Sequence, residues 1–389
     1  MHNLNRRKIL FIDHESGHGG SSISLYNKIK LISNNNYDIS IILKQKSFLE
    51  KKYKRINVKV YYLKIPTITS LAKLSSNILY LIKFFIKFLI FNFKNKKFYK
   101  FLNKFDNIHL NHENLYWLLR AIKLRTNIKV SMSIRTILKK SFFSILQSNI
   151  INNYADKKLF ISRINLKKFN ELSKIMKKNN FILENFYLEK TKSAQFIKKK
   201  FFKKNLTIIS VSNYSYDRGL DRIIDIAKLI QNGKIKNINF IFLGDYKIKS
   251  FKNFFVNKEN YNLKNLAKKN NLKHVKILGH KKNVFKFLND SNILLYLPRT
   301  DSSWGRNIIE SLSNGVPVIA TGKTNILIKS GINGYFLRKY DKNKIFNIIK
   351  KLYSNRNELA HLSLNAKNIA LKKYQKKEIT NKLIDFIEN

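Results

Sequence analysis

The chain has 389 residues, 44% of them hydrophobic, which is enough for two domains that each bury a core. It contains no cysteine, and this excludes disulfides, thiolate metal sites and thiol nucleophiles. Its 77 basic and 23 acidic residues give a formal charge of +54, but only 13 of the basic residues are arginine and lysine is abundant throughout, which indicates the composition bias of an AT-rich genome rather than a dedicated nucleic-acid-binding surface.

The chain opens with a short apolar run followed by a glycine-rich turn. Ile9–Ile12 is too short for the apolar core of a signal peptide, and we predict a buried strand there. Gly17, Gly19 and Gly20 follow it and precede a helix that begins near Ser21. Such a turn lets backbone N–H groups approach a phosphate at a helix N-terminus, although glycine turns also occur where a helix simply packs on a strand.

Short apolar runs alternate with segments of helical period along the whole chain, which predicts βαβ units around parallel sheets. In the first half the predicted strands are Lys8–Ile12, Ile39–Leu43, Val58–Leu63, Ile108–Leu110, Val130–Ile134 and Lys158–Phe160. In the second half they are Thr207–Val211, Asn239–Leu243, Val275–Leu278, Ile293–Tyr296, Val316–Ile319 and Gly334–Leu337. We place two domains at residues 1–190 and 191–372, and expect a helix at residues 373–389 to pack back on the first domain.

The longest apolar segment, Ile78–Phe93, is interrupted by Lys83 and Lys87. A membrane-spanning helix needs about 20 largely uncharged residues, so we expect no transmembrane segment here. A helix that continued to residue 97 would place Lys83, Lys87, Lys94 and Lys97 on one face. Such a helix either lies in the surface of an anionic membrane or packs on its own domain with the lysines reaching solvent.

Polar residues follow two of the predicted strands in the first half. His112 and Glu113 come just after one strand, and Arg135 comes at the end of another. The carboxyl ends of strands in open α/β sheets face ligands, so these residues are candidates for a site. A structural histidine and a surface ion pair are the alternatives.

In the second half, the segment SVSNYSYDRGLDRII joins a strand to an amphipathic helix. Arg218 brings a planar cation that suits phosphate oxygens, whereas Asn213 offers hydrogen bonds without charge. An exposed arginine at a helix start is the alternative for Arg218. Two further strands end in Gly244 and in the pair Gly279 and His280.

Proline and glycine are concentrated between Pro298 and Gly334. This segment contains two of the chain's three prolines and five of its twelve glycines. A polar loop there leads into a helix that starts near Gly305. Its first N–H groups are expected to face a diphosphate, at Trp304, Gly305, Arg306 and Asn307. The alternative is a helix capped by Ser302 or Ser303, with Glu310 as a solvated acid.

Taken in order, these motifs resemble the GT-B fold glycosyltransferases of family 4, retaining enzymes that use nucleotide-activated sugars. The resemblance is strongest from Thr207 to Leu337. It implies an α/β, GT-B fold with two Rossmann-like, doubly wound parallel-sheet domains facing across a cleft. It also implies no cofactor and no bound metal.

The resemblance further implies a donor-binding role for several residues. Arg218 and Asn213 stand where the family has a lysine and an arginine that bind the donor diphosphate. The loops at Gly244 and at Gly279 with His280 would border the nucleotide. We expect Arg218, the turn at Gly19 and Gly20 and the helix start at Gly305 to share the charge of the leaving diphosphate.

Four residues have implied roles near the transferred sugar or the ribose. Glu310 stands at the second glutamate of a paired-glutamate motif and would bind the nucleotide ribose. Ser302 replaces the first glutamate, so Asp301 is the nearest substitute carboxylate. His112 stands where some members place a histidine against the donor sugar.

The sequence therefore predicts a cytoplasmic retaining glycosyltransferase. Its partners would be a nucleotide-sugar donor and a saccharide or lipid-linked acceptor of the cell envelope, and residues 78–97 would hold it at the cytoplasmic face of an anionic membrane. The alternatives are a catalytically impaired nucleotide-sugar-binding relative, because of Ser302 and Asn213, and a basic nucleic-acid-binding protein.

Overall fold

The computed structural model of the chain describes residues 6–15, 17, 20–67, 78–138, 140–173, 179–187, 204–245, 262–281, 283–299 and 305–389. The chain divides into two compact units. We call Met1–Asn185 with Lys376–Asn389 the N-terminal unit, and Phe186–Gln375 the C-terminal unit. The sequence-based boundaries lie close by, after residues 190 and 372.

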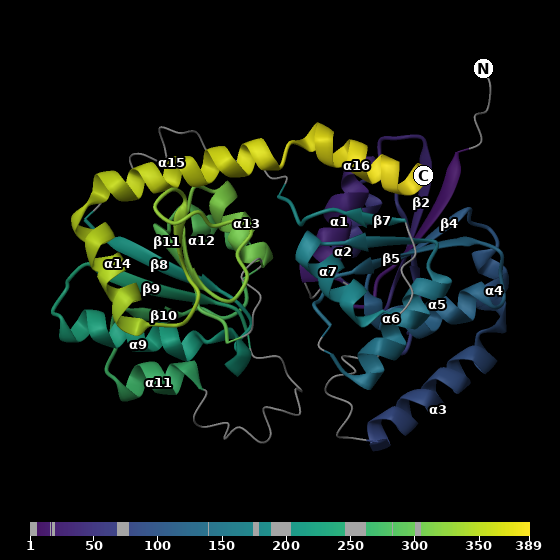
Figure 1. Ribbon diagram of the computed structural model, residues 1–389, viewed down its shortest axis with the longest axis horizontal. Coiled ribbons are helices and arrows are strands. Elements are labelled where there is room, and N and C mark those ends of the chain that lie inside the picture. The colour runs from purple at the N-terminus through teal and green to yellow at the C-terminus, as the bar shows by residue number, and fades with distance from the viewer. Residues whose placement is uncertain are drawn as a thin grey trace. The chain divides into compact units, whose positions relative to one another are not determined.

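The N-terminal unit contains a seven-stranded parallel sheet in the order β3-β2-β1-β4-β5-β6-β7 (Figure 1). Its strands are β1 (Arg7–Ile12), β2 (Tyr37–Leu43), β3 (Lys59–Tyr62), β4 (Asn107–Leu110), β5 (Lys129–Ile134), β6 (Lys157–Phe160) and β7 (Asn180–Ile182). Its helices are α1 (Gly20–Ile32), α2 (Phe48–Lys54), α3 (Ile78–Lys94), α4 (Lys96–Leu102), α5 (Tyr116–Lys123), α6 (Phe142–Tyr154), α7 (Arg163–Leu172) and α16 (Lys376–Glu388).

The C-terminal unit contains a six-stranded parallel sheet in the order β10-β9-β8-β11-β12-β13. Its strands are β8 (Leu206–Val211), β9 (Ile238–Leu243), β10 (Val275–Ile277), β11 (Ile293–Tyr296), β12 (Val318–Thr321) and β13 (Gly334–Leu337). Its helices are α9 (Leu220–Asn232), α11 (Leu263–Lys269), α12 (Val284–Asn289), α13 (Arg306–Ser313), α14 (Lys342–Ser354) and α15 (Arg356–Lys373).

Helices cover both faces of each sheet, which is why the central strands read as continuous apolar runs. Side chains alternate between the two faces, so Ile208 packs in the core on one side of β8 and Ile209 in the core on the other side. In the C-terminal unit α9 and α14 pack together, as do α13 and α15 (Figure 1). The predicted fold of two parallel-sheet α/β units is confirmed.

All twelve predicted strands are present, with three differences in the elements. β7 was not predicted, because three half-buried residues give no readable period. β12 begins at Val318, two residues later than predicted, since Pro317 has no N–H group to donate. The helix predicted at residues 373–389 is α16, which begins three residues later, at Lys376, because α15 ends only at Lys373.

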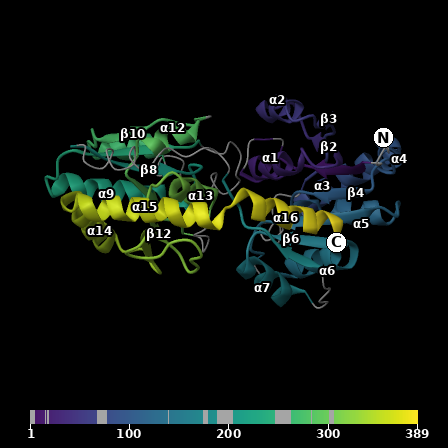
Figure 2. The same ribbon diagram turned by 90° about the horizontal axis from the view of Figure 1, so that it is seen from above.

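α16 packs on the N-terminal unit, beside α1 (Figure 2). It buries Ile379, Leu383, Phe386 and Ile387. The Lys157 ammonium donates hydrogen bonds of 3.0 Å to the carbonyl oxygens of Phe386 and Ile387, where a cation also complements the helix dipole.

Across the residues that the structure describes, no helix has both the length and the apolar character that crossing a bilayer requires. The helix predicted for residues 78–97 is shorter than expected, because α3 ends at Lys94 and α4 begins at Lys96.

Candidate functional site

Both sheets reverse their strand order at one place, between β1 and β4 in the N-terminal unit and between β8 and β11 in the C-terminal unit. In open α/β sheets ligands bind outside the carboxyl ends of the strands at such a switch point. The two switch points are therefore the places to examine for chemistry.

At the C-terminal switch point the structure brings Arg218 to the start of α13. The Arg218 guanidinium donates a hydrogen bond of 2.8 Å to the hydroxyl of Tyr296, the last residue of β11. A side-chain carbon placed on Gly305 would lie 3.7 Å from the same hydroxyl. The Arg218 guanidinium and the N-terminus of α13 therefore both lie next to the Tyr296 hydroxyl.

The start of α13 is held by a side chain other than the predicted caps. Gly305 is the N-cap and supplies no side-chain hydrogen bond, and the alternative caps Ser302 and Ser303 lie outside the described residues. Asn307 instead donates a hydrogen bond of 2.8 Å to the Val211 carbonyl oxygen at the end of β8. The helix start is fixed to the sheet. Within its first turn the Ile308 N–H donates to Asn307 Oδ1 at 3.0 Å, and the N–H groups of Arg306 and Asn307 have no side-chain partner among the described residues.

Glu310 lies one turn along α13 and is only 8% exposed, so the alternative of a solvated acid is wrong. Arg306, four residues earlier, donates to Oε1 of Glu310 from Nε at 2.7 Å and from a second nitrogen. The remaining guanidinium nitrogen of Arg306, NH1, is buried and has no hydrogen-bond partner among the described residues. A buried nitrogen in that state is a ready donor to a ligand oxygen.

Two glycines allow the loops at this switch point to approach each other. Gly219 has φ +62°, and a side-chain carbon there would lie 2.1 Å from the Leu297 carbonyl oxygen. Gly244 has φ +149°, and a side-chain carbon there would lie 1.8 Å from the Ser212 carbonyl oxygen. Neither position has room for a side chain.

The other predicted donor-site residues follow the ends of β8, β9 and β10. Asn213 and His280 are exposed, and Gly244 donates its N–H to the Gly279 carbonyl oxygen at 3.0 Å. Gly20 begins α1 in the N-terminal unit, with open space around its Cα. The remaining predicted site residues lie outside the described residues: Gly19, Asp301, Ser302 and Trp304.

Two arginines that the sequence did not single out brace the loop after β11. Arg299 forms an ion pair with Asp221 and lies 3.8 Å from the centre of the Tyr216 ring. Arg222 donates hydrogen bonds to the carbonyl oxygens of Leu297 and Pro298, at 3.3 and 3.1 Å. The sequence could have pointed to both, because Arg222 lies four residues after Arg218 and Arg299 follows Pro298 directly.

The N-terminal switch point holds a buried polar cluster. Asp13 and His14 follow β1, and Asn111 and His112 follow β4. The rings of His14 and His112 lie 4.1 Å apart, and Asn111 donates a hydrogen bond of 3.2 Å to Asp13. Asp13 and His14 were missed, although both follow a strand as His112 does.

The two rings have opposite charge preferences. Burial lowers the pKa of His112 to about 4, with the charges of His14 and Arg135 adding to the effect and Glu113 opposing it. Burial also disfavours charge on His14, but Asp13 and Glu15, each with an oxygen 3.6 Å from a ring nitrogen, raise its pKa above 6.5. Near neutral pH, a neutral His112 ring therefore lies at 41° to a His14 ring whose surroundings favour the charged form more than water does.

Glu113 binds the segment after β5, which in turn contacts this cluster. Its carboxylate accepts hydrogen bonds from the N–H groups of Arg135 and Thr136, at 2.8 and 3.1 Å, and from the Thr136 hydroxyl. The Arg135 guanidinium donates to the amide oxygens of Asn111 and Asn185, each at 3.4 Å. Within the described parts of the chain, no three His, Asp or Glu side chains are grouped to hold a metal ion.

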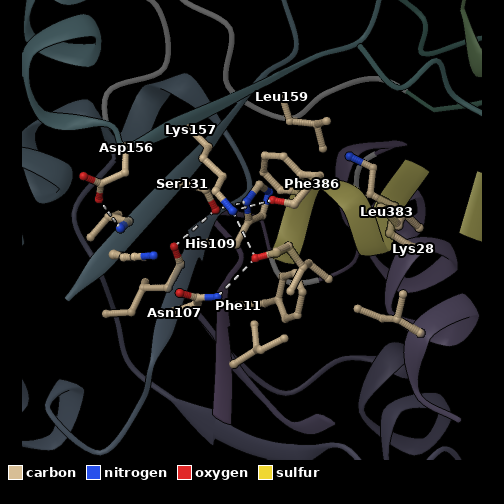
Figure 3. Close-up of a pocket in the computed structure, with 16 residues that line it drawn as sticks. Phe11, Lys28, Asn107, His109, Ser131, Asp156, Lys157, Leu159, Leu383 and Phe386 are labelled. Carbon is tan, nitrogen blue, oxygen red and sulfur yellow. Dashed lines mark hydrogen bonds between the residues drawn. The ribbon is translucent and has the colours of Figure 1, made fainter. Parts of the chain in front are cut away.

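An enclosed cavity lies elsewhere in the N-terminal unit, between its sheet, α1 and α16 (Figure 3). It is lined mostly by hydrocarbon and has a volume of about 40 Å³. Pockets for small organic ligands usually measure about 300–1,000 Å³, so this cavity has room for water but not for a nucleotide.

Comparison with known proteins agrees with this geometry. Residues 191–369 match the family model described as glycosyl transferases group 1. Two uncharacterized glycosyltransferases of Methanocaldococcus jannaschii are 29% and 28% identical to this chain over 160 and 218 residues. These segments are 40% and 52% of this chain and 40% and 50% of the relatives, so the chain spans about half of their length or less.

Solved structures match over nearly the whole chain. Anabaena HepE in complex with UDP-glucose has a TM-score of 0.76 at 18% identity, covering 98% of this chain and 99% of its own. Sucrose-phosphate synthase from Thermosynechococcus elongatus has a TM-score of 0.74 at 14% identity and covers 98% of both chains. The chain thus has the GT-B fold, and its similarity to glycosyl transferases group 1 lies in residues 191–369.

Proposed function

We propose that this protein is a glycosyltransferase that moves a sugar from a nucleotide-sugar donor to an envelope polysaccharide or glycolipid, with retention at the anomeric carbon. The observation that carries the proposal is the meeting of Arg218 with the N-terminus of α13 at the C-terminal switch point. The group 1 match and the UDP-glucose complex of HepE support it.

The chemistry follows from the charge on the leaving group. As the bond between the sugar and the diphosphate breaks, negative charge grows on the diphosphate oxygens. The Arg218 guanidinium and the N–H groups at the start of α13 are fixed before reaction, by Tyr296 and Asn307, and stabilise that charge without rearranging. Glu310, held by Arg306, accepts hydrogen bonds from the ribose hydroxyls.

The donor is a co-substrate in this proposal, and protein groups alone meet the diphosphate charge. Activity is therefore expected to persist in a metal chelator. Because the acceptor belongs to the envelope, we propose a cytoplasmic enzyme that works at the inner face of the membrane.

The test is a thermal-shift screen of nucleotide-sugars, followed by a transfer assay with the donor that stabilises the protein. Saturation at about 100 times Kd adds about 2.7 kcal/mol of stability to the folded state. Arg218→Ala is expected to lower kcat about 10²- to 10³-fold, and Glu310→Ala to weaken donor binding about 10- to 100-fold.

Arg338→Ala, at an exposed arginine after β13 in the same unit, is the matched control and should leave both quantities unchanged. Donor binding that depends on Arg218, without transfer or donor hydrolysis, would identify a catalytically impaired relative instead. If no nucleotide-sugar stabilises the protein, both readings are wrong.

A further inference from the structure

Helix α3 presents an apolar face to solvent. Six large side chains on it are 47–76% exposed: Ile82, Phe85, Ile86, Leu89, Ile90 and Phe93. Single exposed apolar residues are ordinary in soluble proteins, but a continuous row of this kind marks an interaction surface.

The opposite face of α3 anchors the helix to the N-terminal unit. Phe84, Phe88 and Phe91 surround Trp117 of α5, with ring centres 5.8, 4.6 and 6.0 Å from it. The helix is therefore already packed against its own domain through one face. At about 100° of rotation per residue, the exposed row lies on the side of the helix opposite to that contact. The helix itself lies at an edge of the unit (Figure 1).

Lysines flank the apolar row along one side. With about 100° of rotation per residue, Lys83, Lys87 and Lys94 fall within about 40° of one another, between the buried and the exposed faces. Lys83 and Lys87 are exposed, so neither has to reach out from a buried position. Lys97, predicted to continue this row, belongs to α4 instead.

The surrounding sequence carries charge of a single sign. Between Glu50 and Asp106 there are 14 lysines and arginines and no acidic residue. A second copy of this chain would bring the same charges together and be repelled. An anionic surface matches both the charge and the apolar row.

A groove continues the apolar row at the C-terminal end of α3. It has a volume of about 480 Å³ and is lined by Leu89, Asn92, Phe93, Lys96, Tyr99 and Arg125. Lys96 lies 5.3 Å from the centre of the Phe93 ring, and Arg125 lies 4.8 Å from that of Tyr99. Apolar walls with two cations match the junction between a phospholipid's chains and its phosphate.

We propose that α3 docks on an anionic phospholipid membrane, with its apolar row among the acyl chains and a headgroup phosphate between Lys96 and Arg125. The basic flank and the apolar row together are the pattern of an interfacial helix. The docking involves only the N-terminal unit and does not depend on sugar transfer.

The test measures binding of the full-length chain to vesicles of phosphatidylcholine with or without phosphatidylglycerol, in the absence of any sugar donor. We expect binding to the anionic vesicles that weakens but persists at about 1 M salt, where attraction between exposed charges is screened. The triple variant F85S/L89S/F93S should lose at least about tenfold of this affinity and all of the salt-resistant part.

Phe142→Ser is the matched control, because Phe142 on α6 is 75% exposed and Phe93 is 76% exposed. It should bind as the unchanged chain does. Replacing Lys83, Lys87 and Lys94 with glutamine should lower binding to anionic vesicles about fivefold per lysine, with little effect on neutral ones.

The absence of cysteine allows a direct probe of depth. An environment-sensitive dye on Leu89→Cys should shift to the blue on anionic vesicles, and the same dye on Phe142→Cys should not. Binding that salt abolishes and that F85S/L89S/F93S retains would reduce the effect to the chain's overall charge. Self-association without vesicle binding, lost in the triple variant, would assign the row to a second copy. Either result overturns the proposal, and neither bears on donor binding by the C-terminal unit.

Discussion

At the C-terminal switch point the ends of β8 and β11 carry a guanidinium, a phenol hydroxyl and the start of α13. At the N-terminal switch point the ends of β1 and β4 carry instead two imidazoles in contact and a buried carboxylate. The strand order around the two points is the same. Topology therefore fixes where a ligand can lie, and the side chains fix its charge. Among the described residues, a guanidinium beside a helix start, the pair that suits an anion, lies at the C-terminal switch point.

The glycines of the two switch points should differ most. Gly244→Ala forces a side-chain carbon onto the Ser212 carbonyl oxygen at a positive φ, and we expect a loss of about 3 kcal/mol or more in the free energy of unfolding. Gly20→Ala, with open space around it, should change that free energy by less than about 1 kcal/mol. Urea denaturation of both variants tests this. Equal stability of the two would mean that the loop after β9 takes another path.

The paired histidines should give opposite pH effects. Between pH 6.5 and about 4 the unfolded chain protonates at residue 112 and the folded chain does not, so the free energy of unfolding falls with acid by up to about 3 kcal/mol. The contribution of His14 is full below pH 6.5 and is lost as the pH rises through its raised pKa.

Titration of the two ring resonances by NMR measures both pKa values directly. His112→Gln should remove the acid-side loss of stability and His14→Gln the loss at higher pH. Two rings that both titrate near pH 6.5 would contradict the described cluster.

The buried glutamates should separate stability from donor binding. Glu113 accepts three hydrogen bonds that position the loop after β5, so Glu113→Gln should cost about 2 kcal/mol of stability. Among the described residues, the Glu310 carboxylate is bonded by Arg306 alone, so Glu310→Gln should cost less stability and more donor affinity. Denaturation and donor titration of both variants test this. A larger loss of donor affinity in Glu113→Gln, with a larger loss of stability in Glu310→Gln, would contradict it.

The smallest expected effect is at Tyr296. Tyr296→Phe removes the hydroxyl that accepts from Arg218 and leaves the β11 core intact. Donor affinity should fall about fivefold, the usual net value of one hydrogen bond. Isothermal titration measures it; an unchanged affinity would show that Arg218 needs no positioning by the sheet.

The sequence was sufficient to predict local features, namely the strands and the residues that directly follow them. The limits of β11 and β13 were predicted to the residue, because apolar runs bounded by turn residues define buried strands. The placement of Arg218, Glu310 and His112 just beyond strands or on the following helix was equally readable. The helix predicted at residues 373–389 begins at Lys376 in the structure, because no proline or glycine marks the end of α15 at Tyr374.

Contacts between distant segments could not be predicted from the sequence, because they depend on which strands are neighbours in the sheet. Asn111 bonds to Asp13 across 98 residues, and Arg218 bonds to Tyr296 across 78. From the sequence, Tyr296 is a core residue because it ends a buried strand. In the structure its hydroxyl also accepts a hydrogen bond from the Arg218 guanidinium. Strand order sets such contacts, and periodicity within a segment carries no information about it.

The return of α16 to the N-terminal sheet has a consequence for biosynthesis. The N-terminal unit is interrupted by 190 residues and receives its last helix only after the C-terminal unit has been translated. At about 5–20 residues per second, a ribosome takes roughly 10 to 40 s over that interval. During it Lys157 lacks the carbonyl groups that it binds in the finished protein, and the surface that will pack on Leu383 and Phe386 is bare. A nascent chain in that state is a natural client for a holding chaperone.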